Sequence, residues 1–357
     1  MARHDGHVAV TTKVPRRAGR RTNLALLVVL PAAFVTGWLA FGTGTLWPAR
    51  VVTVTHAALG IAVLALVPWK QVIVRRGLVR PGGARGVVVK ATSILLAISV
   101  LLSLAGGFAH SYAGLHTYFG VTAMQVHVGA ALVAVPLFVV HLVTRPQRLR
   151  VTDLSRRNAL RLAGLVGVGG VLFAAVEGIA TIAGLPGRRR RVTGSYETGT
   201  DDPAAMPLTS WLFDRIPSID PATYTVRVRD ANGVRLVGYP ELAEGTDRVR
   251  AILDCTGGWY AAQNWRGVRL DRLLAEIPSG HVIVVTSTTG YRRRFPAAEA
   301  SALWLATHIA DDPLDPGHGA PARLVAPGRR GFWWVKWVAS VETVAGEDWW
   351  QPPFPLQ

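Results

Sequence analysis

Five long apolar segments in the first half of the chain constrain its fold most. At about 1.5 Å per helical residue, each can cross a hydrocarbon core of about 30 Å. We therefore expect five transmembrane helices in a membrane domain over residues 23–185, in a chain of positive mean hydropathy. The segments run over about 23–43, 51–69, 87–108, 120–143 and 161–184.

Basic residues between these segments predict the topology. Arginine is frequent in RRAGRRTN, KQVIVRRGLVRPGGARG and RPQRLRVTDLSRRNALR, whereas FAHSYAGLHTYFG has no Lys or Arg. Cytoplasmic loops carry the excess of Lys and Arg, so we expect a basic cytoplasmic tail over 1–22 and an extracytoplasmic C-terminal domain. Four arginines in GRRRR at 187–191 oppose this orientation. The placement of the +17 net charge favours a membrane-embedded protein, and we expect no nucleic-acid partner.

A pair of arginines precedes the fifth apolar segment. Ser155-Arg156-Arg157-Asn158 followed by LAGLVGVGGVLF is similar to a twin-arginine export signal. Two adjacent arginines are also common in so basic a loop. A folded, cofactor-bearing C-terminal domain would favour the export interpretation.

After residue 192 the long apolar runs give way to short segments of alternating or β-branched residues. TYTVRVRD, GVRLVGY, HVIVVTSTTGY and ARLVAPG predict strands, while RLDRLLAEI and AAEASALWLATHIA predict short helices. We expect a linker over 186–205 and then an α+β domain over 206–357, which is long enough for its own core.

The chain has one cysteine, Cys255. A single thiol excludes a disulfide scaffold and a cysteine-rich metal site. It follows the apolar stretch AILD and precedes Thr256-Gly257-Gly258, an arrangement that can present one side chain to a ligand. Cys255 is therefore either a buried apolar residue or a thiolate ligand.

A second signal lies in HGAPARLVAPGRRGFWWVKWVASVE. Its basic side chains alternate with glycines, prolines and aromatic residues, which suits an anionic, phosphate-bearing ligand. The alternative is a solvated basic face. The basic residues are His318, Arg323, Arg329, Arg330 and Lys336.

Three motifs in order resemble one family. CTGGWYAAQNWRGVRLDRLL, TSTTGYRRRFPAAEA and the 318–342 run resemble the sulfite-oxidase-like molybdopterin oxidoreductase domain over about 206–344. The resemblance implies Mo-molybdopterin as cofactor and Cys255 as the catalytic thiolate ligand of molybdenum. It implies that His318 and Arg323 hold the pterin phosphate. Further cofactor contacts implied by the resemblance are Trp334, Val335, Lys336, Ser287, Ser210, Phe213 and Asp214.

The chain departs from this family at two places. TSWLFDRIP lacks the Asn or Arg-Asn-His usual near the N-terminal contact, and TGGW after Cys255 differs from both sulfite oxidases and methionine-sulfoxide reductases. The substrate therefore does not carry over. Arg266, Arg292, Arg293 or Arg294 could steer an anionic substrate, although a surface role suits each of them as well.

Histidines within the apolar segments are candidates for haem ligands. We expect His56 and His127, with His110 as an alternative, to hold one b haem near the outer surface. Hydrogen bonding between helices is the alternative role. No cytoplasmic-side partner for His141 is evident, and Glu177 could accept a proton at a quinone site.

Together these features predict a membrane-bound molybdenum-cofactor oxidoreductase. We expect oxygen-atom transfer on a small oxo-substrate outside the cytoplasm, with electrons exchanged with the quinone pool or a redox protein through a membrane domain that resembles cytochromes b. A quinol donor would make the reaction reductive, as in the periplasmic methionine-sulfoxide reductases that the domain resembles. The alternative is a non-catalytic, membrane-tethered binding or assembly module.

Overall fold

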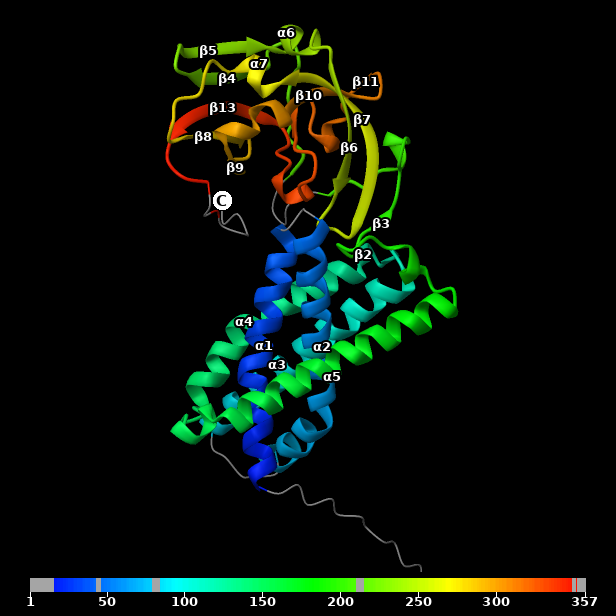
Figure 1. The fold of residues 1–357 in the computed structure, drawn as a ribbon, viewed down its shortest axis with the longest axis vertical. Coiled ribbons are helices and arrows are strands. Elements are labelled where there is room, and N and C mark those ends of the chain that lie inside the picture. Colours follow the sequence, from blue (N-terminus) through cyan, green and yellow to red (C-terminus); the bar gives the residue numbers. More distant parts are fainter. Residues whose placement is uncertain (1–15, 43–45, 79–83, 210–214, 349–350, 352–357) are drawn as a thin grey trace, which may run out of the picture. The chain divides into compact units, whose positions relative to one another are not determined.

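Five long helices form the first half of the chain in a computed structural model that describes residues 16–42, 46–78, 84–209, 215–348 and 351 (Figure 1). All five are long and apolar enough to cross a membrane, as the sequence predicts. The first begins within the expected basic tail. The helices are α1 (Arg16–Gly42), α2 (Leu46–Leu78), α3 (Ala84–Ala113), α4 (Ala123–Thr144) and α5 (Arg156–Ile182).

The chain divides into two compact units. The helical unit comprises Met1–Val35, Val54–Gly107 and Val126–Ile179. The sheet unit comprises Thr36–Thr53, Phe108–Gln125 and Ala180–Gln357. The sheet unit therefore includes the C-terminal ends of α1 and α3 as well as the C-terminal domain.

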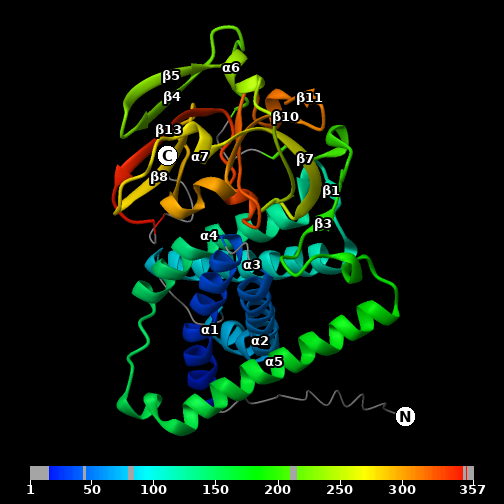
Figure 2. The same ribbon diagram turned by 45° about the horizontal axis from the view of Figure 1, so that its top comes forward.

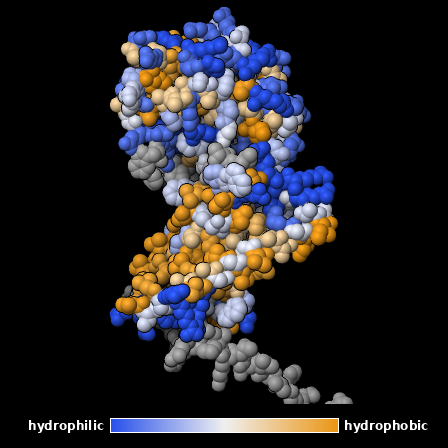
Figure 3. Space-filling view, viewed as in Figure 1, coloured by the Kyte–Doolittle hydropathy of each residue, from blue (hydrophilic) through white to orange (hydrophobic). Residues whose placement is uncertain are grey.

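The helical unit has a small internal core. Val29 of α1 packs with Leu59, Ala62 and Val63 of α2. Many other apolar side chains of these helices face outward, and the space-filling view shows a largely hydrophobic surface over the helices (Figure 3). Such a surface suits a lipid environment.

Two sheets form the core of the sheet unit (Figures 1 and 2). In the first, β11, β10, β7 and β3 are neighbours in this order, β12 pairs with β10, and β6 pairs with β7. These strands are β3 (Tyr196–Glu197), β6 (Asp247–Asp254), β7 (Trp259–Arg269), β10 (Trp304–Ile309), β11 (Asp312–Pro313) and β12 (Arg323–Val325).

The second sheet has the order β5-β4-β13-β8-β9. Strand β13 is parallel to β4 and antiparallel to β8. Alternate residues of β4, Val226 and Val228, are fully buried, as the period of a half-buried strand requires. The strands are β4 (Thr225–Asp230), β5 (Gly233–Gly238), β8 (His281–Ser287), β9 (Arg292–Pro296) and β13 (Val338–Ala345).

Short elements complete the sheet unit. A two-stranded hairpin, β1 (Thr117–Tyr118) and β2 (Val121–Thr122), lies between α3 and α4. The other short helices of this unit are α6 (Tyr239–Ala243), α7 (Leu270–Leu273) and the 3-10 turns η2 (Pro186–Arg189), η3 (Pro203–Ala205), η4 (Ala297–Ala302), η5 (Pro316–His318) and η6 (Gly331–Trp333). The 3-10 turn η1 (Val151–Leu154) precedes α5 in the helical unit.

Three local expectations differ from the structure. The helix expected over 269–277 is limited to α7. The helix expected over 297–310 is a 3-10 turn followed by β10, whose Leu305 and Ala306 are fully buried between β7 and β12. Tertiary pairing thus overrides local helix propensity. The expected linker 186–205 is part of the sheet unit, because β3 pairs with β7.

Candidate functional site

Cys255 lies in the turn that joins β6 to β7. The Cys255 backbone N–H donates to the Trp259 carbonyl at 2.8 Å, and the Gly258 N–H donates to the Cys255 carbonyl at 3.2 Å. The Gly257 N–H points at the Cys255 sulfur, at 3.3 Å. Gly258 has φ +90°, a conformation that favours glycine, so the TGG sequence allows a turn that holds the thiol in place.

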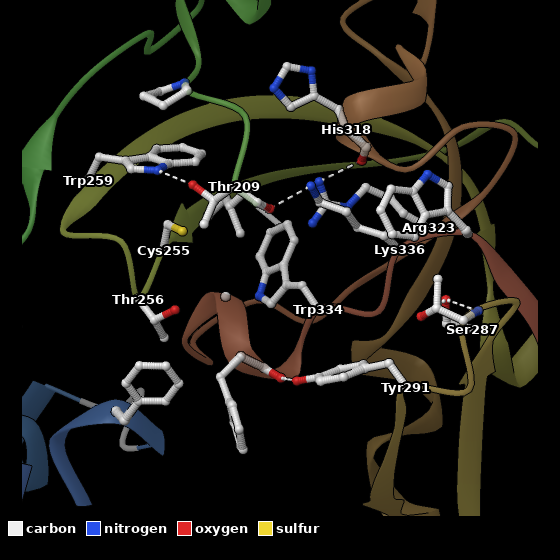
Figure 4. A pocket seen from close by; sticks show the side chains of 17 residues that line it. Thr209, Cys255, Thr256, Trp259, Ser287, Tyr291, His318, Arg323, Trp334 and Lys336 are labelled. Atoms are coloured by element: carbon white, nitrogen blue, oxygen red, sulfur yellow. Dashed lines mark hydrogen bonds between the residues drawn. The ribbon is translucent and has the colours of Figure 1, made fainter. Parts of the chain in front are cut away.

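This thiol faces a pocket that gathers most of the predicted cofactor residues. Cys255, Ser287, His318, Arg323, Trp334 and Lys336 all line it. Figure 4 shows His318, Arg323 and Lys336 on one side and Cys255 with Thr256 on the other. Val335 is fully buried and does not line the pocket, and Ser210, Phe213 and Asp214 lie outside the described residues.

Arg323 has the most unusual environment in the pocket. It is 1% exposed, with its guanidinium over the rings of Trp265 and Trp334 and one N–H donating to the His318 carbonyl at 2.9 Å. Its Nε is buried, and no described residue accepts a hydrogen bond from it. Burial lowers the pKa of Arg323 to about 10, and the Cys255 thiol opposes this shift. The guanidinium is therefore a buried cation that calls for an anion.

His318 and Lys336 extend this basic side of the pocket. Burial, then the charges of Arg323 and Lys336, lower the pKa of His318 to about 4, so the imidazole is neutral near pH 7. The Lys336 ammonium donates to the carbonyls of Thr209 at 2.8 Å and Gly317 at 2.6 Å. These two carbonyl groups orient the ammonium.

A buried ion pair supports Cys255 from behind. Asp254 accepts hydrogen bonds from Thr193 and Ser195, each at 2.7 Å, and pairs with Arg191 at 3.2 Å and Arg330 at 3.6 Å. The Arg330 guanidinium also donates to the Cys255 carbonyl at 3.2 Å. Sequence alone shows Arg330 only as one of several basic residues, because its pairing with Asp254 joins segments that are distant in the chain.

Gly331 brings the chain after Arg330 against the cysteine. A Cβ at this glycine would lie 3.1 Å from the Cys255 Cα, which is closer than about nine in ten real Cβ contacts. Only glycine permits this approach without a shift of the backbone. Gly331 and Phe332 thereby become part of the pocket wall.

None of the four arginines considered for substrate steering lines the pocket. Arg266 donates to the carbonyls of Ala243 and Gly245, and Arg292 and Arg294 are exposed. Arg293 is 1% exposed, with its guanidinium 3.9 Å from the Phe332 ring centre and its Nε donating to the Tyr291 hydroxyl at 2.9 Å. It supports two pocket-lining side chains, Tyr291 and Phe332, and was underestimated from sequence.

His110 lies within the sheet unit and against the cysteine turn. Its ring nitrogen Nε2 is 2.9 Å from the Gly194 carbonyl, and its ring stands edge-on to Tyr196, with 5.4 Å between ring centres. A Cβ on Gly258 would meet the His110 ring at 2.4 Å. The close fit explains why His110 is 2% exposed.

In the helical unit, His56 and His127 face each other, with 5.7 Å between ring centres and planes at 77°. The Nδ1 of His56 is 2.9 Å from the Ala33 carbonyl, and that of His127 is 2.7 Å from the Ser103 carbonyl. A carbonyl can only accept, so each Nδ1 carries the hydrogen and each neutral ring keeps its lone pair on Nε2. His141 has a partner that sequence did not reveal, the Ser93 hydroxyl at 3.1 Å, and Glu177 is half-buried in α5.

Comparisons with known proteins agree with the chemistry of this pocket. Residues 214–350 match the model of the oxidoreductase molybdopterin binding domain. These residues form a molybdopterin-binding oxidoreductase domain. The match confirms the resemblance seen in the sequence for this domain, which makes up less than half of the chain.

One solved structure similar to the chain is the sulfane dehydrogenase SoxCD from Paracoccus pantotrophus. It shares 23% identity at a TM-score of 0.34, over 36% of this chain and 40% of that one. This chain thus spans less than half of the SoxCD chain. No curated protein matches the chain.

The pocket of the molybdopterin domain fits its cofactor by donor chemistry. Arg323 is a buried cation whose Nε bonds to no described residue, which suits an anionic pterin phosphate. Cys255 offers a sulfur ligand that its turn holds in place. Within the described ranges, no three His, Cys, Asp or Glu side chains are grouped to hold a metal ion.

Proposed function

We propose that this chain is a membrane-embedded molybdenum-cofactor oxidoreductase that transfers an oxygen atom to or from a small oxo-substrate outside the cytoplasm. One observation carries the proposal: the single thiol, Cys255, shares a pocket with the buried Arg323, whose Nε bonds to no described residue. A metal-binding sulfur and a phosphate-binding cation at opposite sides of one cavity suit one ligand that has both groups.

The residues have separate tasks in this proposal. Cys255 holds the metal, while Arg323, Lys336 and His318 hold the pterin phosphate. When bound, the cofactor supplies a metal centre that exchanges an oxygen atom together with two electrons. Asp254 and Arg330 fix the Cys255 backbone, so that the thiol stays in one orientation.

The test is metal analysis joined to turnover. Purified full-length protein should contain about one molybdenum per chain, and reduced viologen should be reoxidised by at least one member of a panel of sulfoxides, N-oxides and sulfur oxyanions. Protein that is folded and loaded but inert with the whole panel in both directions would favour the non-catalytic binding or assembly module. Folded protein without molybdenum would overturn the cofactor assignment.

The membrane domain is proposed to exchange electrons with the quinone pool or a redox protein through a b haem held by His56 and His127. Support comes from their facing rings and from the carbonyl-bonded Nδ1 atoms, an arrangement typical of metal-ligating histidines. His56→Ala and His127→Ala should each abolish the b-type bands of a reduced-minus-oxidised spectrum, while the exposed His116→Ala keeps them. Wild-type protein without such bands would exclude the haem.

The proposed location is the cell membrane, with the C-terminal domain outside the cytoplasm and Arg156-Arg157 in a twin-arginine signal. Support comes from the arginine-rich loops at 70–86 and 145–161 and from the cofactor-bearing domain that follows α5. A phosphatase reporter fused after residue 357 should be active only if exported. Activity that survives Arg156→Lys together with Arg157→Lys would separate the topology from the export route.

A further inference from the structure

We propose that His110, in the last turn of α3, is a positioning residue for the Cys255 thiol and acts on it through Gly258. The inference rests on the proposed function for the role of this thiol as a metal ligand. The segment Phe108–Gln125 belongs to the same compact unit as the C-terminal domain. The end of a membrane-length helix therefore lies in one unit with the cysteine turn, residues 255–258.

The His110 ring occupies the space in which a side chain of residue 258 would lie. A Cβ built on Gly258 would be 2.4 Å from the His110 Cε1 and 2.8 Å from its Nε2, distances that real Cβ atoms essentially never show. Gly258 also has φ +90°, which side chains rarely adopt. The imidazole therefore packs directly on the glycine backbone, and its burial shows that other groups enclose it as well.

Gly258 is linked to the sulfur by the hydrogen bonds that close the cysteine turn. Its N–H donates to the Cys255 carbonyl at 3.2 Å, and the Cys255 N–H donates to the Trp259 carbonyl at 2.8 Å. The N–H of the preceding residue, Gly257, points at the Cys255 sulfur at 3.3 Å. A shift of Gly258 would therefore move both the amide that faces the sulfur and the bonds around it.

Tyr196 holds the imidazole and the glycine together. Its hydroxyl donates to the His110 carbonyl at 2.8 Å, and its backbone N–H donates to the Gly258 carbonyl at 3.0 Å. The His110 Nε2 lies 2.9 Å from the Gly194 carbonyl. Because a carbonyl can only accept, Nε2 carries the hydrogen and the ring is fixed at this edge.

The segment that contains Gly194 and Tyr196 is also bonded to the residue before the cysteine. Arg191, Thr193 and Ser195 bond to the Asp254 carboxylate at 3.2, 2.7 and 2.7 Å. This segment therefore contacts the last turn of α3 through two of its residues and the start of the cysteine turn through three others.

The same contacts give a place to arginines that oppose the expected topology. Arg190 donates to the Ser111 carbonyl at 2.9 Å, and its guanidinium lies 5.3 Å from the centre of the Tyr112 ring. Its neighbour Arg191 pairs with Asp254. Two of the four arginines of the GRRRR block thus join the end of α3 to the cysteine turn.

Loss of the imidazole would loosen the cysteine turn without removing a ligand from the metal. His110→Ala opens a cavity beside Gly258, and a glycine that loses its packing partner can adopt many backbone conformations. The Cys255 sulfur would then sample several orientations. Residues that orient a metal ligand typically affect metal affinity or activity by about 10–100-fold.

The first experiment measures the thiol in the full-length apoprotein. Cys255 is the only cysteine of the chain, so alkylation by iodoacetamide reports on this thiol alone. His110→Ala should raise the alkylation rate about 10-fold, whereas His110→Phe, which keeps a ring against Gly258, should stay within about 3-fold of wild type. His116→Ala, at an exposed histidine of the loop after α3, is the matched control and should change nothing.

The second experiment measures the metal centre in loaded protein. The electron paramagnetic resonance spectrum of the partly reduced molybdenum should have shifted g values in His110→Ala and wild-type values in His110→Phe and His116→Ala. In His110→Ala, kcat should fall about 10-fold while KM changes less than about 3-fold, because the orientation of the metal ligand is altered and the rest of the pocket is kept. A role in stability alone would lower the melting temperature and leave the spectrum unchanged.

The outcomes separate the positioning role from the proposed function. Wild-type alkylation rates and spectra in folded His110→Ala overturn the proposal, and so does His110→Phe with the same rise as His110→Ala. If His110→Ala does not fold, Tyr196→Phe replaces it, since it removes the hydroxyl that bonds to the His110 carbonyl. An unchanged alkylation rate in that variant overturns the proposal as well. Protein without molybdenum overturns the proposed function, whereas the alkylation rates need no metal and test the contact of His110 with the cysteine turn separately.

Discussion

Two buried arginines of the sheet unit, Arg330 and Arg323, have opposite surroundings. Arg330 is 5% exposed and meets the Asp254 carboxylate together with the carbonyls of Thr193 and Cys255. Arg323 is 1% exposed and meets one carbonyl and two indole rings, with its Nε unbonded by any described residue. Arg330 is thus neutralised by Asp254, whereas Arg323 has no ion pair among the residues that the structure describes.

This difference in surroundings indicates a structural role for Arg330 and a ligand-binding role for Arg323. Burying a charge is costly unless a partner neutralises it, so a fold that buries an unpaired guanidinium loses stability in the absence of its ligand. Arg330 holds the turn that carries Cys255. In the proposed function, the charge of Arg323 is available to the cofactor phosphate, since no described carboxylate pairs with it.

The largest loss of turnover is expected for Cys255→Ser, because Cys255 lies between the turn that Arg330 holds and the pocket that Arg323 lines. Because the thiol is the proposed metal ligand, turnover should fall about 10³-fold, beyond the 10–100-fold typical of residues that only support a ligand. Viologen oxidation with the best substrate measures it, with the melting temperature as the folding control. Turnover within a few-fold of wild type would assign Cys255 to packing.

Arg330→Met should destabilise the turn that carries Cys255 and lower the free energy of unfolding of the apoprotein. It leaves the Asp254 carboxylate buried with only the partly exposed Arg191 as a cation, and loss of one partner of a buried pair costs about 3 kcal/mol or more. The apoprotein should melt at a clearly lower temperature. Arg330→Met with Asp254→Asn should recover part of the loss, since it removes the unpaired charge; no recovery would contradict the pairing.

Arg323→Met should have the opposite pattern: the stability of the apoprotein is kept and cofactor binding is weakened. Removal of an unneutralised buried cation leaves the apoprotein as stable as wild type or more so, since methionine keeps much of the packing on Trp265 and Trp334. Cofactor affinity should fall about 100-fold, the value of a strong charge-assisted hydrogen bond. Cofactor retention on dilution measures it. Apoprotein as destabilised as Arg330→Met would erase the distinction between the two arginines.

The smallest effect concerns pH and His318. Its pKa of about 4 in the folded protein lies below the ordinary 6.5, so between these values the unfolded chain takes up a proton that the folded chain does not. The contribution of the neutral His318 to the free energy of unfolding is fully present above pH 6.5. It is lost as the pH falls toward 4, and the loss reaches about 1–2 kcal/mol by pH 5. His318→Gln should flatten the melting temperature of the apoprotein over this range. An equal slope in wild type and variant would contradict the lowered pKa.

The helices and most of the pocket residues could be predicted from the sequence, because hydropathy and short motifs are local features of the chain. The five helices follow from hydropathy, and Cys255, His318, Arg323, Trp334 and Lys336 converge as the motif order implies. Contacts between distant segments could not be predicted. Asp254 meets Arg330, and the Trp333 indole reaches Gly42 across 291 residues of sequence. Strand β10 was expected to be helical because Ala and Leu favour helices, but its pairing with β7 decides its conformation.

Cys255 is proposed to bind molybdenum in the pocket where Arg323 is proposed to bind the cofactor phosphate. X-ray absorption at the molybdenum edge tests it most directly, on full-length wild type and Cys255→Ser. We expect molybdenum in both proteins, with one sulfur neighbour fewer in the variant. Wild-type protein without molybdenum, or identical sulfur shells in the two proteins, would contradict the claim.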